Sequence, residues 1–223
     1  MKNQIFKISL LAVLFATSIL GVACSKNDTS GTKGQNNSSN LTASILALPK
    51  ESLSDAEINS VLHLREEEKL ARDVYYTLNL KYNANVFANI KSSEESHMDA
   101  ILQILNKYAI PDPVTTNGIG VFKNNDLQLL YNQLVEKGNL SLLDAYKVGA
   151  TIEDLDLFDL KDHLAVIDNQ DIILVYNNLS KGSRNHMRSF YKNIVNSNGT
   201  YTPQFISQTE FDGIINSSME TGF

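Results

Sequence analysis

The segment 85–108 reads NVFANIKSSEESHMDAILQILNKY. Its apolar residues recur at steps of three and four, which predicts one buried face along an α-helix. This face consists of Phe87, Ile90, Ile101, Ile104 and Tyr108. Glu94 and His97 fall in the same register, between Ile90 and Ile101. Both side chains are therefore predicted to point into the protein, one helical turn apart.

The segments on either side of this helix continue the helical period. Ser54 followed by Glu57 is a capping box, which predicts the start of a helix over 54–80. Pro111 helps to end the helix of the opening segment, and a loop is predicted over 115–125. Further helices are predicted over 126–137, 141–166 and 169–195.

The sequence predicts an all-α fold, because no run of residues alternates between polar and apolar as a strand would. Four long helices with a long connection between the second and the third are typical of a four-helix bundle with one crossover. We expect this bundle over 54–197, followed by a short C-terminal extension over 198–223.

Charged residues also occupy the apolar registers of the other three long helices. Glu68, Glu153 and His186 lie in these registers. A lone buried carboxylate is costly or takes up a proton, but one cation can neutralise several carboxylates together. With Glu94 and His97 the inward set has three carboxylates and two imidazoles, and such oxygen and nitrogen ligands suit iron or manganese.

Several of these residues also have a simpler interpretation. Glu94 and Glu95 could form a solvated pair, and His186 could be a surface residue of a basic turn. Glu68 belongs to the run Glu66–Lys69, and a run of charges usually forms a solvated helix face. Glu153 has several aspartates nearby, so the choice of carboxylate on that helix stays open. His63 and His163 fall outside the inward registers, and we interpret them as structural.

An export signal is predicted over 1–23 at the N-terminus. Lys2 and Lys7 precede an apolar run, which small residues and the single cysteine, Cys24, follow. This order resembles a bacterial lipoprotein signal. The resemblance implies a lipid anchor at Cys24 that attaches an exported protein to a membrane, on its periplasmic or cell-surface side. The alternative is an ordinary signal peptide. A flexible tether is predicted over 24–53, because its first part is rich in Ser, Asn, Gly and Thr.

Composition excludes several classes of function. Nineteen basic and 25 acidic residues give a net charge of −6, which argues against nucleic-acid binding. One cysteine rules out an intrachain disulfide and a thiolate zinc site. The sequence contains no complete Gly-rich phosphate motif. The sequence does not identify a protein partner, and it is compatible with a homodimer.

Three segments resemble a known family. REEEKLARDVY at 65–75, SEESHMDA at 93–100 and GSRNH at 182–186 look like the signature of domain of unknown function 2202, a ferritin-like family. The resemblance runs from about residue 53 to 195. It implies a rubrerythrin-like bundle that binds iron or manganese, with Tyr75 near the metal as a hydrogen-bond or electron donor.

One position departs from the standard di-iron pattern. The fourth helix of that pattern repeats Glu-x-x-His, but Ser183 stands where the glutamate belongs. A single metal, an asymmetric pair completed by Asp156, and no metal at all stay open.

Two classes of function follow from the sequence. The first is a membrane-tethered ferroxidase, peroxide-reducing or iron-handling protein, which as an enzyme would be a di-iron-type oxidoreductase. The alternative is a non-enzymatic ferritin-like scaffold or interaction module with a degenerate metal site. A hydrolase is disfavoured, because no Ser-His-acid or Cys-His set has a recognisable spacing.

Overall fold

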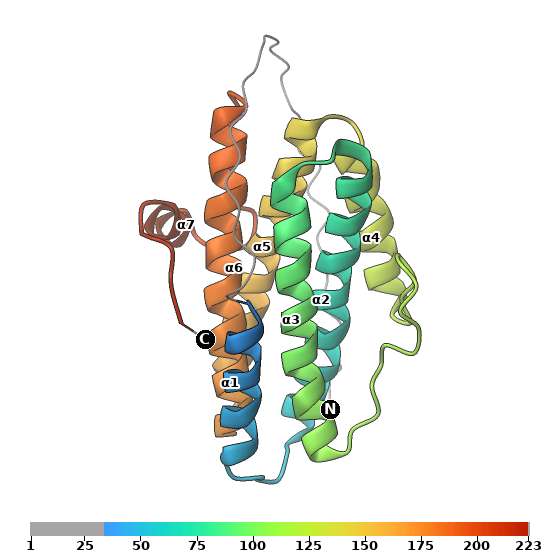
Figure 1. The fold of residues 1–223 in the computed structure, drawn as a ribbon, viewed down its shortest axis with the longest axis vertical. Helices are drawn as coiled ribbons and strands as arrows, with labels where there is room; N and C mark the ends of the chain where they lie inside the picture. The colour runs from blue at the N-terminus through green and yellow to red at the C-terminus, as the bar shows by residue number, and fades with distance from the viewer. Residues whose placement is uncertain (1–33, 223) are drawn as a thin grey trace. The chain divides into compact units, whose positions relative to one another are not determined.

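The computed structural model describes residues 34–222, so the predicted export signal and the predicted lipidation at Cys24 lie outside the described residues. This part of the chain contains seven helices and no strand, which confirms the predicted all-α class (Figure 1). The helices are α1 (Gly34–Ala47), α2 (Asp55–Tyr82), α3 (Asn85–Tyr108), α4 (Asn125–Gly138), α5 (Leu142–Leu164), α6 (Gln170–Asn196) and α7 (Gln208–Ile215).

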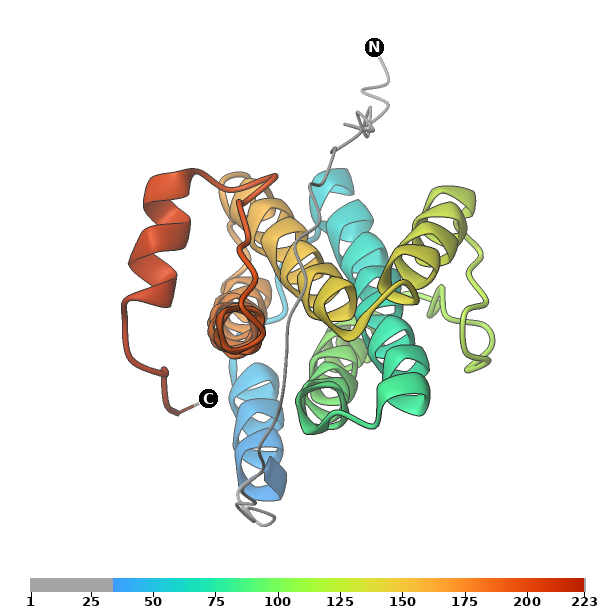
Figure 2. The same ribbon diagram turned by 90° about the horizontal axis from the view of Figure 1, so that it is seen from above.

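The four long helices pack as two hairpins side by side. Helix α2 pairs with α3 and α5 pairs with α6, and further contacts join α2 to α5 and α3 to α6. This packing is consistent with a four-helix bundle, and Figure 2 shows the four helices from above. The connection between the two hairpins contains α4, which lies against α2 and α5 on the outside.

Local signals explain where the central helices begin and end. Ser54 and Glu57 form the predicted capping box at the start of α2. Helix α3 has the predicted bounds, and Ala109 directly after its last residue has a φ of 56° that turns the chain. The N–H of Ile110 donates to the carbonyl of Leu105 just before the prolines begin.

Helix α1 differs from the predicted tether. It occupies Gly34–Ala47 and packs against α3 and α6, where Leu41 and Ile45 are buried. At the C-terminal end of α1, the carbonyls of Ile45 and Leu48 accept hydrogen bonds from Lys107 of α3. Among the side chains of α1 that the structure describes, Leu41 and Ile45 are the buried apolar ones, which is too few for a periodic signal in the sequence. A short helix owes its stability to packing rather than to propensity.

The core consists of two apolar clusters with a polar layer between them. On α3 the residue Ile90 belongs to one cluster and Ile101 to the other, and on α6 Phe190 and Leu179 do the same. The inward acids and histidines lie between these positions. Among the described residues, no helix has the length and apolar content needed to cross a membrane.

Candidate metal centre

Five buried side chains from four helices meet in the polar layer. They are Glu68 from α2, Glu94 and His97 from α3, Glu153 from α5 and His186 from α6. These are the five residues whose registers predicted an inward position. The structure brings them together, and their role as metal ligands stays a prediction.

The five residues form two triads that share Glu94. In the first triad, His97 Nδ1 lies 2.8 Å from Glu94 Oε2 and 3.1 Å from Glu68 Oε2. In the second, His186 Nδ1 lies 2.9 Å from Glu94 Oε1 and 3.3 Å from Glu153 Oε2. The ligand atoms of each triad lie within 4.8 Å of one another. Glu94 therefore offers one oxygen to each triad.

The two imidazoles present the same ring atom to the acids. Their rings are stacked with centroids 5.5 Å apart. The other ring nitrogen of His186, Nε2, lies 2.9 Å from the Ser93 hydroxyl. A hydrogen bond on the far nitrogen fixes the tautomer and orientation of a metal-binding histidine. Ser93 is thus placed to keep Nδ1 of His186 free for a metal.

A glycine of α6 makes room for His97. A Cβ atom at Gly182 would lie 2.4 Å from His97 Nε2, which is closer than any real Cβ contact. The neighbouring Ser183 is buried, and its hydroxyl donates to the carbonyl of Leu179 in its own helix. Ser183 therefore adds no ligand atom to either triad.

Tyr75 and Asp156 take up different positions around the cluster. The buried Tyr75 hydroxyl donates a hydrogen bond to Glu153 Oε1. Asp156 is buried and its Oδ1 has no hydrogen-bond partner among the described residues. It contributes no atom to either triad. Asp154, the residue after Glu153, is structural, because it accepts hydrogen bonds from Tyr201 and from three backbone amides of the C-terminal segment.

Burial and charge together shift the protonation of the cluster. Burial would lower the pKa of His186, but Glu94 and Glu153 outweigh it and raise this pKa to about 10. In the same way Glu68 and Glu94 raise the pKa of His97 well above its usual value. Burial raises the pKa of Glu68 to about 7, whereas the two imidazoles lower that of Glu94 despite its burial.

The donor set fits a divalent ion. Each histidine Nδ1 faces two carboxylate oxygens, and a single N–H cannot point at both. As a result, the buried Glu94 Oε1 has no hydrogen-bond partner in the described chain. An ion at each triad would be bound by all three groups at once, in place of the protons that the histidines hold.

The charge run that contains Glu68 is not a solvated face. Glu66, Glu67, Glu68 and Lys69 are all buried. Glu66 accepts hydrogen bonds from the backbone of Lys123 and Asn124, so it fixes the connection that leads into α4.

Lys69, the residue after Glu68, also fixes the connection that leads into α4. Its Nζ donates to Asp73 and to the carbonyls of Gly118 and Val121. Arg72 donates to both Asp73 and Asn117. Sequence reasoning missed these residues, although charges of opposite sign four apart on one helix were a signal for the pair Lys69–Asp73.

Comparisons with known proteins agree with one another. The model of a family described as "Uncharacterized protein domain (DUF2202)" matches residues 57–218. The uncharacterized protein MJ0754 of Methanocaldococcus jannaschii is 53% identical over 178 residues, which cover 80% of this chain and 96% of that protein. A crystal structure of the hypothetical protein MJ0754 from Methanococcus jannaschii DSM 2661 matches with a TM-score of 0.77, and the match covers 78% of this chain and 99% of the other.

Proposed function

The chain belongs to the family of the uncharacterized protein domain DUF2202, and we propose that it binds two iron or manganese ions in the core of a ferritin-like bundle. The observation that carries this proposal is the position of Glu94. One carboxylate shared by two triads, each with its own histidine and its own second glutamate, has the form of a bridged dinuclear site. Metals in such sites lie about 3.5–4 Å apart, a separation that one carboxylate can bridge with its two oxygens.

The second glutamate of the standard pattern is not needed for this arrangement. Glu153 of α5 supplies a carboxylate to the triad of His186, where Ser183 supplies none. The pair would be asymmetric, since Glu94 is the one carboxylate that belongs to both triads. We expect Glu68 and Glu153 to act as terminal ligands of one ion each.

The surrounding residues hold the ligands in place. Ser93 orients His186, the Tyr75 hydroxyl fixes one oxygen of Glu153, and the Gly182 backbone leaves room for His97. Iron or manganese bound there would supply electron transfer with dioxygen or peroxide, the chemistry of a ferroxidase or a peroxide-reducing enzyme. The apolar clusters above and below the site limit access of water to it.

A non-enzymatic scaffold is the second candidate, and one observation favours it. Each imidazole contacts two carboxylates, so two imidazolium ions and the acids can balance their charges without a metal. Glu68 with a pKa of about 7 can hold a proton and reduce the negative charge further. In this case the cluster would serve only to fix the four helices.

Counting bound ions separates the two candidates. We would titrate the full chain with Mn(II), and compare it with Glu94→Gln and Glu153→Gln. Because Glu94 belongs to both triads, Glu94→Gln should lower the number of bound ions by two, and Glu153→Gln by one. Equal numbers in all three proteins would support the scaffold.

We also propose that Cys24 carries a lipid anchor that holds the protein at a membrane. The support is the order of charged, apolar and small residues before a single cysteine.

A further inference from the structure

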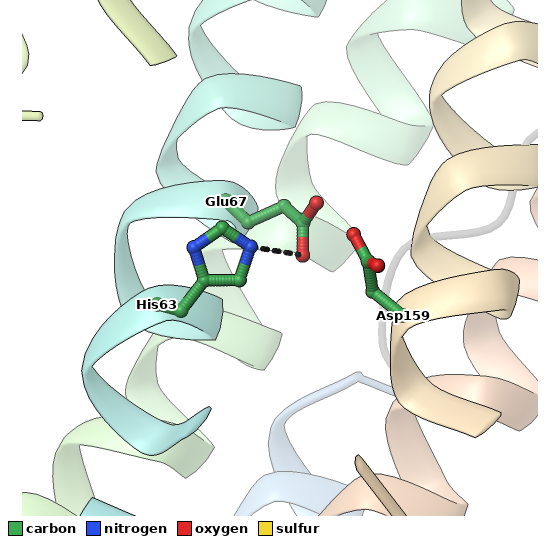
Figure 3. Close-up of side chains that lie close together, drawn as sticks. All are labelled: His63, Glu67 and Asp159. Carbon is green, nitrogen blue, oxygen red and sulfur yellow. Dashed lines mark ion pairs between the residues drawn. The ribbon is translucent and has the colours of Figure 1, made fainter. Parts of the chain in front are cut away.

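A third group of possible ligands lies apart from the two triads. His63 and Glu67 are one turn apart on α2, and Asp159 faces them from α5 (Figure 3). One ligand atom from each of these residues lies within 4.8 Å of the other two. The group shares no residue with the central cluster.

Glu67 is buried with an oxygen that lacks a hydrogen bond. The residue is 3% exposed, and its Oε2 has no hydrogen-bond partner among the described residues. Figure 3 shows its carboxylate between the imidazole of His63 and the carboxylate of Asp159. His63 Nε2 lies 3.8 Å from Glu67 Oε2, too far for a hydrogen bond but suited to a shared ion.

The group opens to solvent on the side of His63. The His63 side chain is 37% exposed, whereas Asp159 is 7% exposed. Because His63 is exposed and the two carboxylates are buried, a hydrated ion can reach the imidazole from solvent. It can then exchange some of its water for the carboxylates of Glu67 and Asp159. One imidazole and two carboxylates are ligands that manganese, iron and zinc all accept.

We propose that His63, Glu67 and Asp159 form a separate site for one divalent first-row metal ion. The three protein ligands leave positions for water on the exposed side. The site does not rest on the function proposed above, since it needs no ion in the central cluster.

A shared proton is the competing explanation. The buried carboxyl groups of Glu67 and Asp159 can hold one proton between them, and then no ion is required. The two explanations differ in a measurable way, because only a metal site loses affinity when His63 is replaced.

The test uses Mn(II) titration of the full chain with the substitution Glu94→Gln, which removes the shared ligand of the central cluster. We expect this protein to retain one bound Mn(II). Adding Asp159→Asn should weaken that binding at least about tenfold, because even outer-sphere changes alter metal affinity by that factor. Adding His63→Gln should weaken it as well. His63 is partly exposed, so this second variant is expected to fold.

The matched control is Asp162→Asn, an exposed acid on the same helix that belongs to none of the ligand groups. It should leave the retained Mn(II) unchanged. The proposal is overturned if the Glu94→Gln protein binds no Mn(II), or if folded Asp159→Asn and His63→Gln proteins bind it as before. If the central cluster binds no metal, the result is different: the original protein and the Glu94→Gln protein then bind equal numbers of Mn(II) ions.

Discussion

Glu94 holds its Oε1 atom 2.9 Å from Nδ1 of His186, and this buried oxygen still lacks a hydrogen bond. Its other oxygen, Oε2, lies 2.8 Å from Nδ1 of His97. One carboxylate is thus held between two imidazoles that come from different helices. A group in this position links α3 to α6, and any ion bound on either side of it would link further helices.

Metal binding should therefore stabilise the fold through Glu94. An ion that binds only the folded state adds about 2.7 kcal/mol when the free metal is one hundred times its dissociation constant. We expect Fe(II) or Mn(II) to raise the melting temperature, and Glu94→Gln to remove most of that rise.

Glu95→Gln is the control for this experiment. Glu95 is the next residue on α3, but it is exposed and pairs with Lys91. Its replacement should leave the metal-dependent rise intact. A rise that survives Glu94→Gln unchanged would contradict the shared-ligand geometry.

The metal-free protein should lose stability as the pH rises. Glu68 has a pKa of about 7 in the folded state against an ordinary value of 4.5, so the folded protein binds more protons than the unfolded chain between these values. The pKa of His186, raised to about 10 from 6.5, extends the same effect to higher pH. Since stability falls wherever the folded state binds more protons, both groups act in one direction.

We expect the melting temperature of metal-free protein to fall between about pH 5 and about pH 8, measured by calorimetry. The rise in melting temperature that Mn(II) causes should grow over the same pH range, because ligands must release their protons to bind a metal. An increment that shrinks with rising pH would contradict the assignment of these histidines as ligands.

Helix α3 shows how far the sequence could predict the site. Its apolar period and the prolines after it define the bounds of the helix, and the register of Glu94 and His97 follows from the same period. Periodicity works here because α3 buries one well-defined stripe. The same reasoning predicted that Glu68, Glu153 and His186 point inward.

Helix α2 shows why the rest could not be predicted. It contacts α3, α4 and α5, so it buries several faces and shows no single stripe. Glu67 and Glu68 are adjacent in the sequence, yet each faces a different group of ligands. Lys69 is buried because a distant connection supplies its carbonyl partners. Such contacts depend on tertiary structure and leave no periodic signal.

The lipid anchor is tested by Cys24→Ala. Diacylation requires the cysteine thiol, so the substituted protein should move from the membrane fraction to the soluble fraction or accumulate unprocessed. Cell fractionation with immunoblotting measures both outcomes. If the substituted protein is processed and fractionates like the original, the ordinary signal peptide is the better interpretation.

Asp156→Asn should stabilise the metal-free protein. Burial and four neighbouring glutamates, Glu67, Glu153, Glu68 and Glu94, hold the pKa of Asp156 well above its ordinary value. An amide of the same shape is neutral at every pH, so it avoids the cost of either charging or protonating this buried acid, whose Oδ1 has no partner. The gain in melting temperature should be larger at about pH 8 than at about pH 5. The fold keeps a proton on Asp156 that the unfolded chain releases, and the cost of this difference grows as the pH rises above the ordinary pKa of 3.8. A loss of stability at both pH values would show that Asp156 has a partner that this geometry does not reveal.

Gly182→Ala should weaken metal binding at the triad of His97. Alanine in a helix interior is ordinarily more favourable than glycine by about 1 kcal/mol. Here the new Cβ would lie 2.4 Å from His97 Nε2, so the ring must shift, and its present contacts with Glu68 and Glu94 must change. Gly213→Ala on α7 is the matched control, since nothing lies within 4 Å of its Cβ position. We expect calorimetric Mn(II) titration to show one ion weakened by Gly182→Ala and none by Gly213→Ala. If Gly182→Ala raises the melting temperature and leaves every ion bound as before, the assignment of His97 as a metal ligand is contradicted.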